Sequence, residues 1–188
     1  MSKLENKIKV MPKAVVCEDS TIKGDVTICS GSVIHPSAQI IAESGPIIIG
    51  ENCIIEEYAK IIHRIPPDHK LAQEKNHVLV IGANNLFEVG STVEALKIGE
   101  KNIFECKSYV SSNVTISSGC VIGAGCHVVG EQHLPENTVI FGKNCQQREA
   151  LDKVSGSHML QLDFLRKVLP NYHHLRKPCD IKKAANLS

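Results

Sequence analysis

The sequence predicts an all-β fold, a single-stranded parallel β-helix with the shape of a triangular prism, followed by a C-terminal α-helix. Aliphatic residues recur at every sixth position through most of residues 8–145, and small residues recur four positions after them. Beyond residue 158 this pattern gives way to leucines spaced by three and four. A period of six fits neither an α-helix nor an ordinary strand, but it fits one short strand followed by one corner. Such a repeat is typical of a solenoid.

The aliphatic repeat contains two long runs, each with a step of six residues. They are Val10, Val16, Ile22, Ile28, Ile34 and Ile40, and then Ile98, Phe104, Val110, Ile116, Ile122, Val128, Leu134 and Ile140. Three steps make a coil of 18 residues, so Ile98 and Ile116 should lie above one another at the strand spacing of ~4.8 Å. We therefore expect aliphatic ladders that fill a narrow interior.

The residues between the aliphatic positions fit the same geometry. The small residue, for example Ser20 or Ala38, lies two positions before the next aliphatic residue and therefore shares its face of the strand. Glycine and asparagine occur between the strands, as in residues 99–102 and 123–125, and both tolerate the positive φ of a tight corner. These positions should be the corners of the prism.

Two segments outside the repeat are expected to leave the prism. Residues 63–79 include the polar, proline-containing stretch around Pro66 and Pro67, so we expect an excursion loop there. Residues 146–158 carry neither pattern and should form a linker. The β-helix is thus expected to occupy residues 8–145.

The C-terminal region predicts an amphipathic helix within residues 159–177, followed by a flexible tail at 178–188. Pro170 should stop or kink this helix near Leu169. We expect the helix to fold back onto a flat face of the prism. The residues predicted to dock the helix or to contact a partner form one stripe, Leu162, Leu165, Leu169 and Tyr172.

Charge and composition narrow the classes of partner. The 21 Lys and Arg residues nearly balance the 20 Asp and Glu residues, and this balance favours neither nucleic acid nor an anionic membrane as a partner. The basic residues of the last 29 are expected to form a solvated surface. No signal peptide and no apolar run of membrane-spanning length is apparent, so we expect a cytoplasmic protein without direct membrane insertion. The eight cysteines should then be reduced thiols.

Part of the sequence resembles the gamma class of carbonic anhydrases. The similarity lies in the Gly24-Asp25 pair, in the histidine that ends Ile61-Ile62-His63 and in the coil that begins Ile81-Gly82. That family has two further histidines in this coil, five residues apart, which complete a catalytic zinc site. The equivalent positions here are Val89 and Glu94, so we expect no metal and no cofactor. His63 is then interpreted as a remnant ligand or as the anchor of the excursion loop.

The remaining candidates for chemistry are weaker. A hexapeptide acyltransferase would present a catalytic base in the excursion loop, where His69 and His77 lie, but no neighbouring residues mark an acyl-donor pocket. Cys120 and Cys126 are interpreted as core residues, because no second cysteine pair completes a metal motif. Two classes of function therefore remain open. One is an enzyme of the carbonic anhydrase or acyltransferase type, and the other is a non-catalytic protein that acts as a subunit of a larger assembly.

A closer resemblance covers nearly the whole chain. The segments that carry it are Gly24-Asp25-Val26-Thr27-Ile28, Asn84-Asn85-Leu86-Phe87-Glu88-Val89-Gly90, Pro135-Glu136-Asn137-Thr138-Val139-Ile140 and Leu169-Pro170-Asn171-Tyr172-His173-His174-Leu175. With these segments the chain resembles the dynactin subunit 6 family. Hexapeptide repeats of this kind resemble those of left-handed β-helices, so the resemblance also implies the hand of the coil.

This resemblance implies a non-enzymatic protein. A member of the family would pair with the related β-helical dynactin subunit 5 and lie near dynactin subunit 4 and an actin-related protein at the pointed end of dynactin. It would be cytoplasmic and associated with the cytoskeleton, and would support the engagement of cargo by dynein and dynactin in microtubule-based transport. The expected contact surfaces are the terminal coils, the flat faces and the C-terminal helix.

Overall fold

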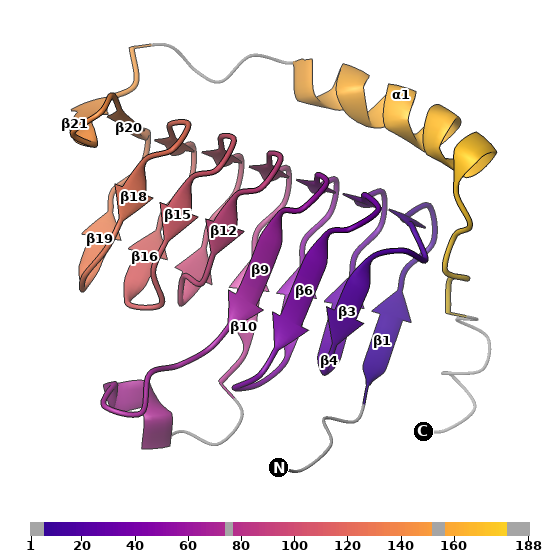
Figure 1. The fold of residues 1–188 in the computed structure, drawn as a ribbon, viewed down its shortest axis with the longest axis horizontal. Coiled ribbons are helices and arrows are strands. Elements are labelled where there is room, and N and C mark those ends of the chain that lie inside the picture. Colours follow the sequence, from indigo (N-terminus) through magenta and orange to yellow (C-terminus); the bar gives the residue numbers. More distant parts are fainter. Residues whose placement is uncertain (1–5, 74–76, 152–156, 180–188) are drawn as a thin grey trace.

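The structure, a computed structural model, describes residues 6–73, 77–151 and 157–179. The chain winds as a left-handed parallel β-helix whose successive coils lie side by side along one axis (Figure 1). One long helix, α1 (Ser157–Tyr172), lies against the side of the N-terminal coils. The predicted fold class is confirmed.

The coils stack their strands into three sheets, which are the faces of the prism. Sheet A contains β1 (Lys7–Val10), β4 (Asp25–Ile28), β7 (Ile47–Ile49), β10 (Leu79–Ile81), β13 (Lys97–Ile98), β16 (Val114–Ile116) and β19 (Gln132–Leu134). Sheet B contains β2 (Val15–Val16), β5 (Val33–Ile34), β8 (Ile54–Ile55), β11 (Leu86–Phe87), β14 (Ile103–Phe104), β17 (Val121–Ile122), β20 (Thr138–Phe141) and β21 (Gln146–Glu149). Sheet C contains β3 (Thr21–Lys23), β6 (Gln39–Ala42), β9 (Lys60–His63), β12 (Thr92–Val93), β15 (Tyr109–Val110) and β18 (His127–Val128).

The register of the sheets confirms the aliphatic ladders. Ile98 lies opposite Ile116, which lies opposite Leu134, and all three are buried. Within sheet B the rings of Phe87 and Phe104 stack with centroids 4.6 Å apart and planes at 6°. Burial of these apolar side chains is the main favourable contribution to folding, and the register aligns them in the interior.

A ladder of polar side chains lies inside the corner between sheets A and B. Asn85 is fully buried, and its amide nitrogen donates to the carbonyl oxygens of Gly82 and Gly99, at 2.7 and 2.8 Å. Its Oδ1 accepts the backbone N–H of Asn102 at 2.8 Å, and the Oδ1 of Asn102 accepts the N–H of Cys120 at 2.7 Å. These side chains satisfy backbone groups that turn away from the strand ladders.

The corners use more residue types than glycine and asparagine. Gly24, at φ 83°, needs its freedom, because a Cβ there would lie 2.4 Å from the carbonyl oxygen of Ala42. Asn84 also has a positive φ, of 60°, as expected, but so do Lys101 and Lys107, both at 57°. The stacked coil therefore imposes this conformation on lysine, a residue that rarely adopts it.

The excursion loop leaves the prism after β9 and returns at β10. It contains a short 3₁₀ helix, Lys70–Gln73, while residues 74–76 lie outside the described part of the chain. The first and last residues of the expected loop, His63 and Leu79, belong to these strands. The loop proper is therefore shorter than residues 63–79.

The region after the β-helix differs from our expectation in three ways. The expected linker begins with β21, which pairs antiparallel with β20, while residues 152–156 lie outside the described residues. Helix α1 starts at Ser157 and continues through Pro170 to Tyr172. A proline removes one N–H, and so close to the end of a helix it affects only the last turn. The start of the expected tail is held, because the N–H of Cys179 donates to the carbonyl of Val10 at 2.8 Å; residues 180–188 lie outside the described chain.

These differences protect the two edges of sheet B. At the C-terminal end β21 pairs with the last parallel strand, β20. At the N-terminal end Leu175 forms an antiparallel bridge with Cys17, and the N–H of Arg176 donates to the carbonyl of Val16 at 2.8 Å. Exposed strand edges are a hazard for aggregation. Strand β21 and the segment with Leu175 and Arg176 therefore have a stabilising role that the repeat did not predict.

We predict that Asn85→Ala destabilises the protein by about 2–4 kcal/mol, because the Gly99 carbonyl and the Asn102 N–H lose their partner and the Gly82 carbonyl keeps only the Cys53 thiol. Equilibrium unfolding in urea measures this change. Asn144→Ala removes the same amide from the exposed turn between β20 and β21 and should change stability by less than about 0.5 kcal/mol. Equal effects of the two substitutions would contradict a structural role for the ladder.

Candidate functional site

Helix α1 packs on the outer face of sheet B. Leu162 and Leu169 are buried against Val15, Val33 and Ile54, which are also buried. Leu165 is half-buried in the same cluster. The aliphatic outer positions of β2, β5 and β8 thus form a flat surface for the leucine stripe of α1.

The predicted interface residues do not all share this contact. Tyr172 is 78% exposed and lies at the last residue of α1, so it takes no part in the buried cluster. Leu160 and Phe164 are also largely exposed, at 74% and 63%, on the side of α1 that faces away from the prism. The helix therefore has an inner stripe that docks it and outer apolar residues that remain accessible.

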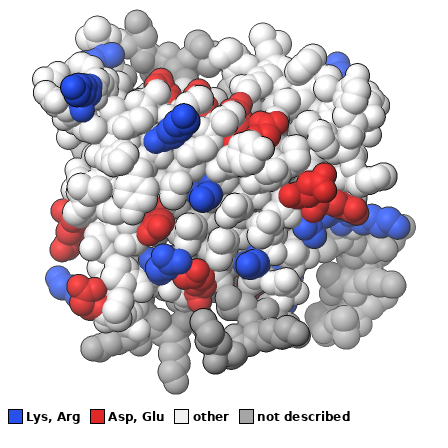
Figure 2. All heavy atoms as spheres, viewed as in Figure 1, with Lys and Arg blue, Asp and Glu red and all other residues white. Residues whose placement is uncertain are grey.

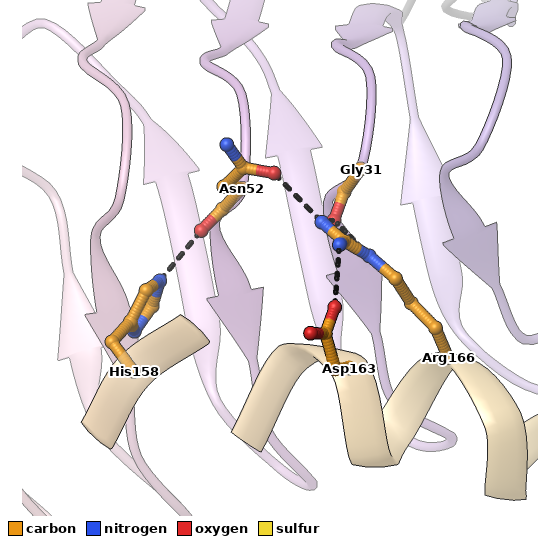
Figure 3. Close-up of polar contacts among 5 residues, drawn as sticks. All are labelled: Gly31, Asn52, His158, Asp163 and Arg166. Atoms are coloured by element: carbon orange, nitrogen blue, oxygen red, sulfur yellow. Dashed lines mark hydrogen bonds and ion pairs between the residues drawn. The ribbon is translucent and has the colours of Figure 1, made fainter. Parts of the chain in front are cut away.

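Polar contacts fix the position of α1 along the prism (Figure 3). The guanidinium of Arg166 donates to the carbonyl of Gly31, to Oδ1 of Asn52 at 2.7 Å and to Asp163 at 3.4 Å. The ring of His158 donates from Nε2 to the carbonyl of Asn52 at 2.7 Å. A Cβ at Gly31 would lie 2.4 Å from the Arg166 guanidinium, so a larger residue there would disturb this contact.

The expectation that the basic C-terminal residues are solvated is wrong for two of them. Arg166 binds the corner of the prism, and Arg176 donates to the carbonyls of Glu18 and Ser20 at 3.2 and 2.9 Å. The sequence held a signal for Arg166, since it lies four residues after Leu162 and three before Leu169, on the docking face of α1. No comparable pattern marked Asn52 or Gly31.

His63 supports the excursion loop. It is buried at the end of β9, and its Nε2 lies 2.8 Å from the carbonyl oxygen of His77. A carbonyl can only accept, so Nε2 carries the proton. The two imidazole rings lie 5.3 Å apart and are tilted by 48°. Burial lowers the pKa of His63, which favours its neutral form.

The side chains at the three positions that correspond to zinc ligands, His63, Val89 and Glu94, do not point toward a common site. Val89 is partly exposed, and its N–H donates to Glu56 at 3.1 Å. Glu94 follows the buried Val93, so its side chain points to the outer face of sheet C, whereas His63 is buried. Within the described ranges no group of three or more His, Cys, Asp or Glu side chains could hold a metal ion.

His69 of the excursion loop and the two core cysteines have local partners. The ring of His69 accepts the N–H of Leu71 at 3.1 Å, inside the excursion loop. Cys120 and Cys126 are buried, and their thiols contact the carbonyls of Pro135 and Gly142 at 3.2 and 3.5 Å. Burial raises the pKa of both thiols, which keeps them protonated and unreactive.

A row of glutamates borders sheet B on its side toward sheet C. Each carboxylate accepts the backbone N–H at the same corner of the next coil: Glu56 from Val89 at 3.1 Å, Glu88 from Cys106 at 3.0 Å and Glu105 from Ala124 at 2.8 Å. In Figure 2 acidic side chains gather along the upper border of the visible face, the side on which α1 lies in Figure 1. Burial, together with the neighbouring Glu88 carboxylate, raises the pKa of Glu56.

Helix α1 also makes a polar contact with this border. The side-chain amide of Gln161 donates to Oε1 of Glu56 at 3.1 Å. The helix is therefore held on both sides of sheet B, by Glu56 at one corner and by Asn52 at the other. Among the described helices, none is long and apolar enough to cross a membrane.

Sequences from several organisms match about nine-tenths of the chain. Dynactin subunit 6 of Nematostella vectensis is 49% identical over 172 residues, covering 91% of this chain and 93% of the relative. Dynactin subunit 6 of Xenopus tropicalis is 49% identical over 174 residues, covering 90% and 85%, and that of Dictyostelium discoideum is 39% identical over 182 residues, covering 93% and 90%. No protein-family model matches the chain.

Solved structures share the architecture at much lower identity. A hexapeptide transferase family protein from Anaplasma phagocytophilum has a TM-score of 0.64 at 16% identity, covering 85% of this chain and 87% of that one. An acetyltransferase domain from Neisseria gonorrhoeae has a TM-score of 0.53 at 13% identity, covering 78% and 58%. These likenesses show the hexapeptide-repeat fold alone. The sequence identity over about nine-tenths of the chain is decisive for kinship, and the chain belongs to the dynactin subunit 6 family.

Proposed function

We propose that this chain is a non-catalytic assembly subunit of dynactin. In this role it pairs with the β-helical dynactin subunit 5 and contacts dynactin subunit 4 and the actin-related protein of the pointed end. The complex is cytoplasmic and associated with the cytoskeleton, and it supports cargo engagement by dynein and dynactin in microtubule-based transport. The observation that carries the proposal is the 49% identity to dynactin subunit 6 sequences over about nine-tenths of the chain.

The geometry of the described residues supports an assembly role. The imidazole of His63 is committed to the His77 carbonyl, and the carboxylate of Glu94 lies on the outer face. Apolar side chains that could enter an interface are exposed on α1, namely Leu160 and Phe164. The two residues lie one helical turn apart, and contiguous apolar patches on a surface are typical of protein interaction sites.

Reconstitution tests this proposal against the enzymatic alternatives. We expect the purified chain to join a complex with dynactin subunits 4 and 5 and the actin-related protein, to carry no stoichiometric zinc and to show no hydration of carbon dioxide. Native mass spectrometry and metal analysis measure these properties. A zinc-loaded homotrimer with hydratase activity would contradict the proposal, since carbonic anhydrases of this fold place their sites between subunits.

We predict that Leu169→Asp releases α1 from sheet B. The substitution places a carboxylate among buried aliphatic side chains, so stability should fall by about 2–5 kcal/mol and co-purification with the partner subunits should weaken. Leu165→Asp should act in the same direction with a smaller effect. Leu160→Asp on the exposed side of α1 controls for helix propensity in the stability measurement. Unchanged unfolding and unchanged co-purification of both inner variants would contradict this placement.

The burial of His63 predicts a pH dependence of stability. Its folded pKa lies below the value of about 6.5 in an unfolded chain. Between pH 6.5 and the folded pKa, the unfolded state therefore binds a proton that the folded state does not. The free energy of unfolding decreases as the pH is lowered through this range. Above pH 6.5 this contribution is constant.

The substitution His63→Gln isolates this contribution, because glutamine keeps an N–H donor for the His77 carbonyl but does not titrate. We expect the loss of stability between pH 7.5 and 5.5, measured by urea unfolding, to be smaller in His63→Gln than in the unmodified protein. His127→Gln, which alters an exposed histidine, is the control. An unchanged pH profile in His63→Gln would show that His63 does not govern the slope.

A further inference from the structure

The outer face of sheet B differs from the other two faces of the prism. Its outward row is aliphatic in every coil: Val15, Val33, Ile54, Leu86, Ile103, Val121 and Val139. The corresponding row of sheet C is Thr21, Gln39, Lys60, Thr92, Tyr109 and His127. Parallel strands that are apolar on both faces are typical of sheets covered on both faces.

Helix α1 covers only the N-terminal part of this row. Val33 and Ile54 are fully buried beneath it, and Leu86 lies at the edge of the cluster. Ile103, Val121 and Val139 lie outside the cluster and are only half-buried. The second half of the aliphatic row thus extends the surface on which α1 docks, but α1 does not cover it.

The border of this row repeats as well. Glu88 and Glu105 occupy, in the following coils, the place where Glu56 receives the amide of Gln161 from α1. Lys107 lies at the same corner, two residues after Glu105. The border keeps a net negative charge, because it also contains Glu56 and Glu88. The chemistry that holds α1, leucines on the row and a donor on the border, is therefore available a second time.

We propose that Ile103, Val121 and Val139, with Leu86 at their edge, form a docking surface for an amphipathic helix of a partner protein. The partner helix presents aliphatic side chains three and four residues apart to the row, and basic or amide side chains to Glu88 and Glu105. This inference deepens the proposed function and rests on it, because it assigns one face of the prism to the assembly.

Charge favours such a partner over a second copy of this chain. A second copy that used the same face would bring its own glutamate border and half-exposed aliphatic row to the contact. Like charges brought together at an interface oppose association, whereas a basic edge on the partner helix complements the border. Aliphatic residues at helical spacing also match the leucine stripe by which α1 binds the first half of the row.

The test compares two faces of the same coil. Val121 and Thr115 are both half-buried, outward-facing residues, on β17 of sheet B and β16 of sheet A. We expect Val121→Asp to weaken binding of the purified chain to a subcomplex of dynactin subunits 4 and 5 and the actin-related protein by about tenfold or more. Thr115→Asp should bind within about twofold of the unmodified chain, and circular dichroism verifies that both variants are folded.

A second pair of variants tests the charge. Glu105→Gln retains a side-chain oxygen for the N–H of Ala124 but removes the carboxylate charge, so the affinity should fall and depend less on salt. Glu100→Gln removes an exposed carboxylate outside this border and should leave both properties unchanged.

Photo-crosslinking from p-benzoylphenylalanine at position 121 identifies the occupant. An adduct to a basic, leucine-containing helix of a partner supports the proposal. Equal binding of Val121→Asp and Thr115→Asp, or an adduct to a second copy of this chain, overturns it while leaving the assembly role intact. If the unmodified chain binds none of the subunits, the proposed function fails, and the inference fails with it.

Discussion

The closure of the chain into three-sided coils, 18 residues long where nothing is inserted or lost, is the constraint on which the rest of this structure depends. Once three short strands and three corners close, each residue lies above its equivalent in the previous coil, and one register fixes all three sheets. The interior is narrow, so the inward side chains of successive coils stack in line, as Ile98, Ile116 and Leu134 do. The same stacking aligns the amides of Asn85 and Asn102 inside one corner. A residue's role therefore depends on its place in the coil more than on its neighbours in sequence.

This constraint explains why the fold was accessible from the sequence and why the ends of the chain were not. The period of six specifies the ladders, because any shift by one residue would expose every aliphatic side chain. The strand β21 carries no aliphatic period, since Gln146, Gln147, Arg148 and Glu149 are all exposed. It is held by backbone pairing with β20 and by the Arg148 guanidinium over the Phe141 ring. The bridge between Cys17 and Leu175 likewise depends on backbone groups at the open edge of β2. Edge pairing of this kind leaves little side-chain pattern, and it follows from geometry that exists only after folding.

In the candidate site, too, some features were predictable from the sequence and others were not. The leucine stripe of α1 was predictable from helical periodicity, and the burial of Leu162 and Leu169 follows from it. The exposure of Tyr172 was not predictable from this periodicity. The leucine stripe stays in contact with sheet B only where the helix lies on it, and α1 ends at Tyr172. The carbonyl of Gly31 and the side chain of Asn52 meet Arg166 across more than 100 residues of sequence. Contacts between distant residues that pair a guanidinium with a backbone carbonyl have no local signature, so only the structure could supply them.

A rigid repeat of this kind leaves function to its outward positions. The solved hexapeptide proteins that share the architecture are named as transferases, while the relatives that share the sequence are named as dynactin subunits, so the coil itself does not select a chemistry. In this chain the ring of His63 holds a loop, the amides of the corner hold the backbone, and the guanidinium of Arg166 holds α1. Each of these polar groups is engaged in keeping a surface in place. A row of aliphatic side chains, half covered by a helix and bordered by carboxylates, is then the feature of the described residues that most clearly requires another molecule to complete it.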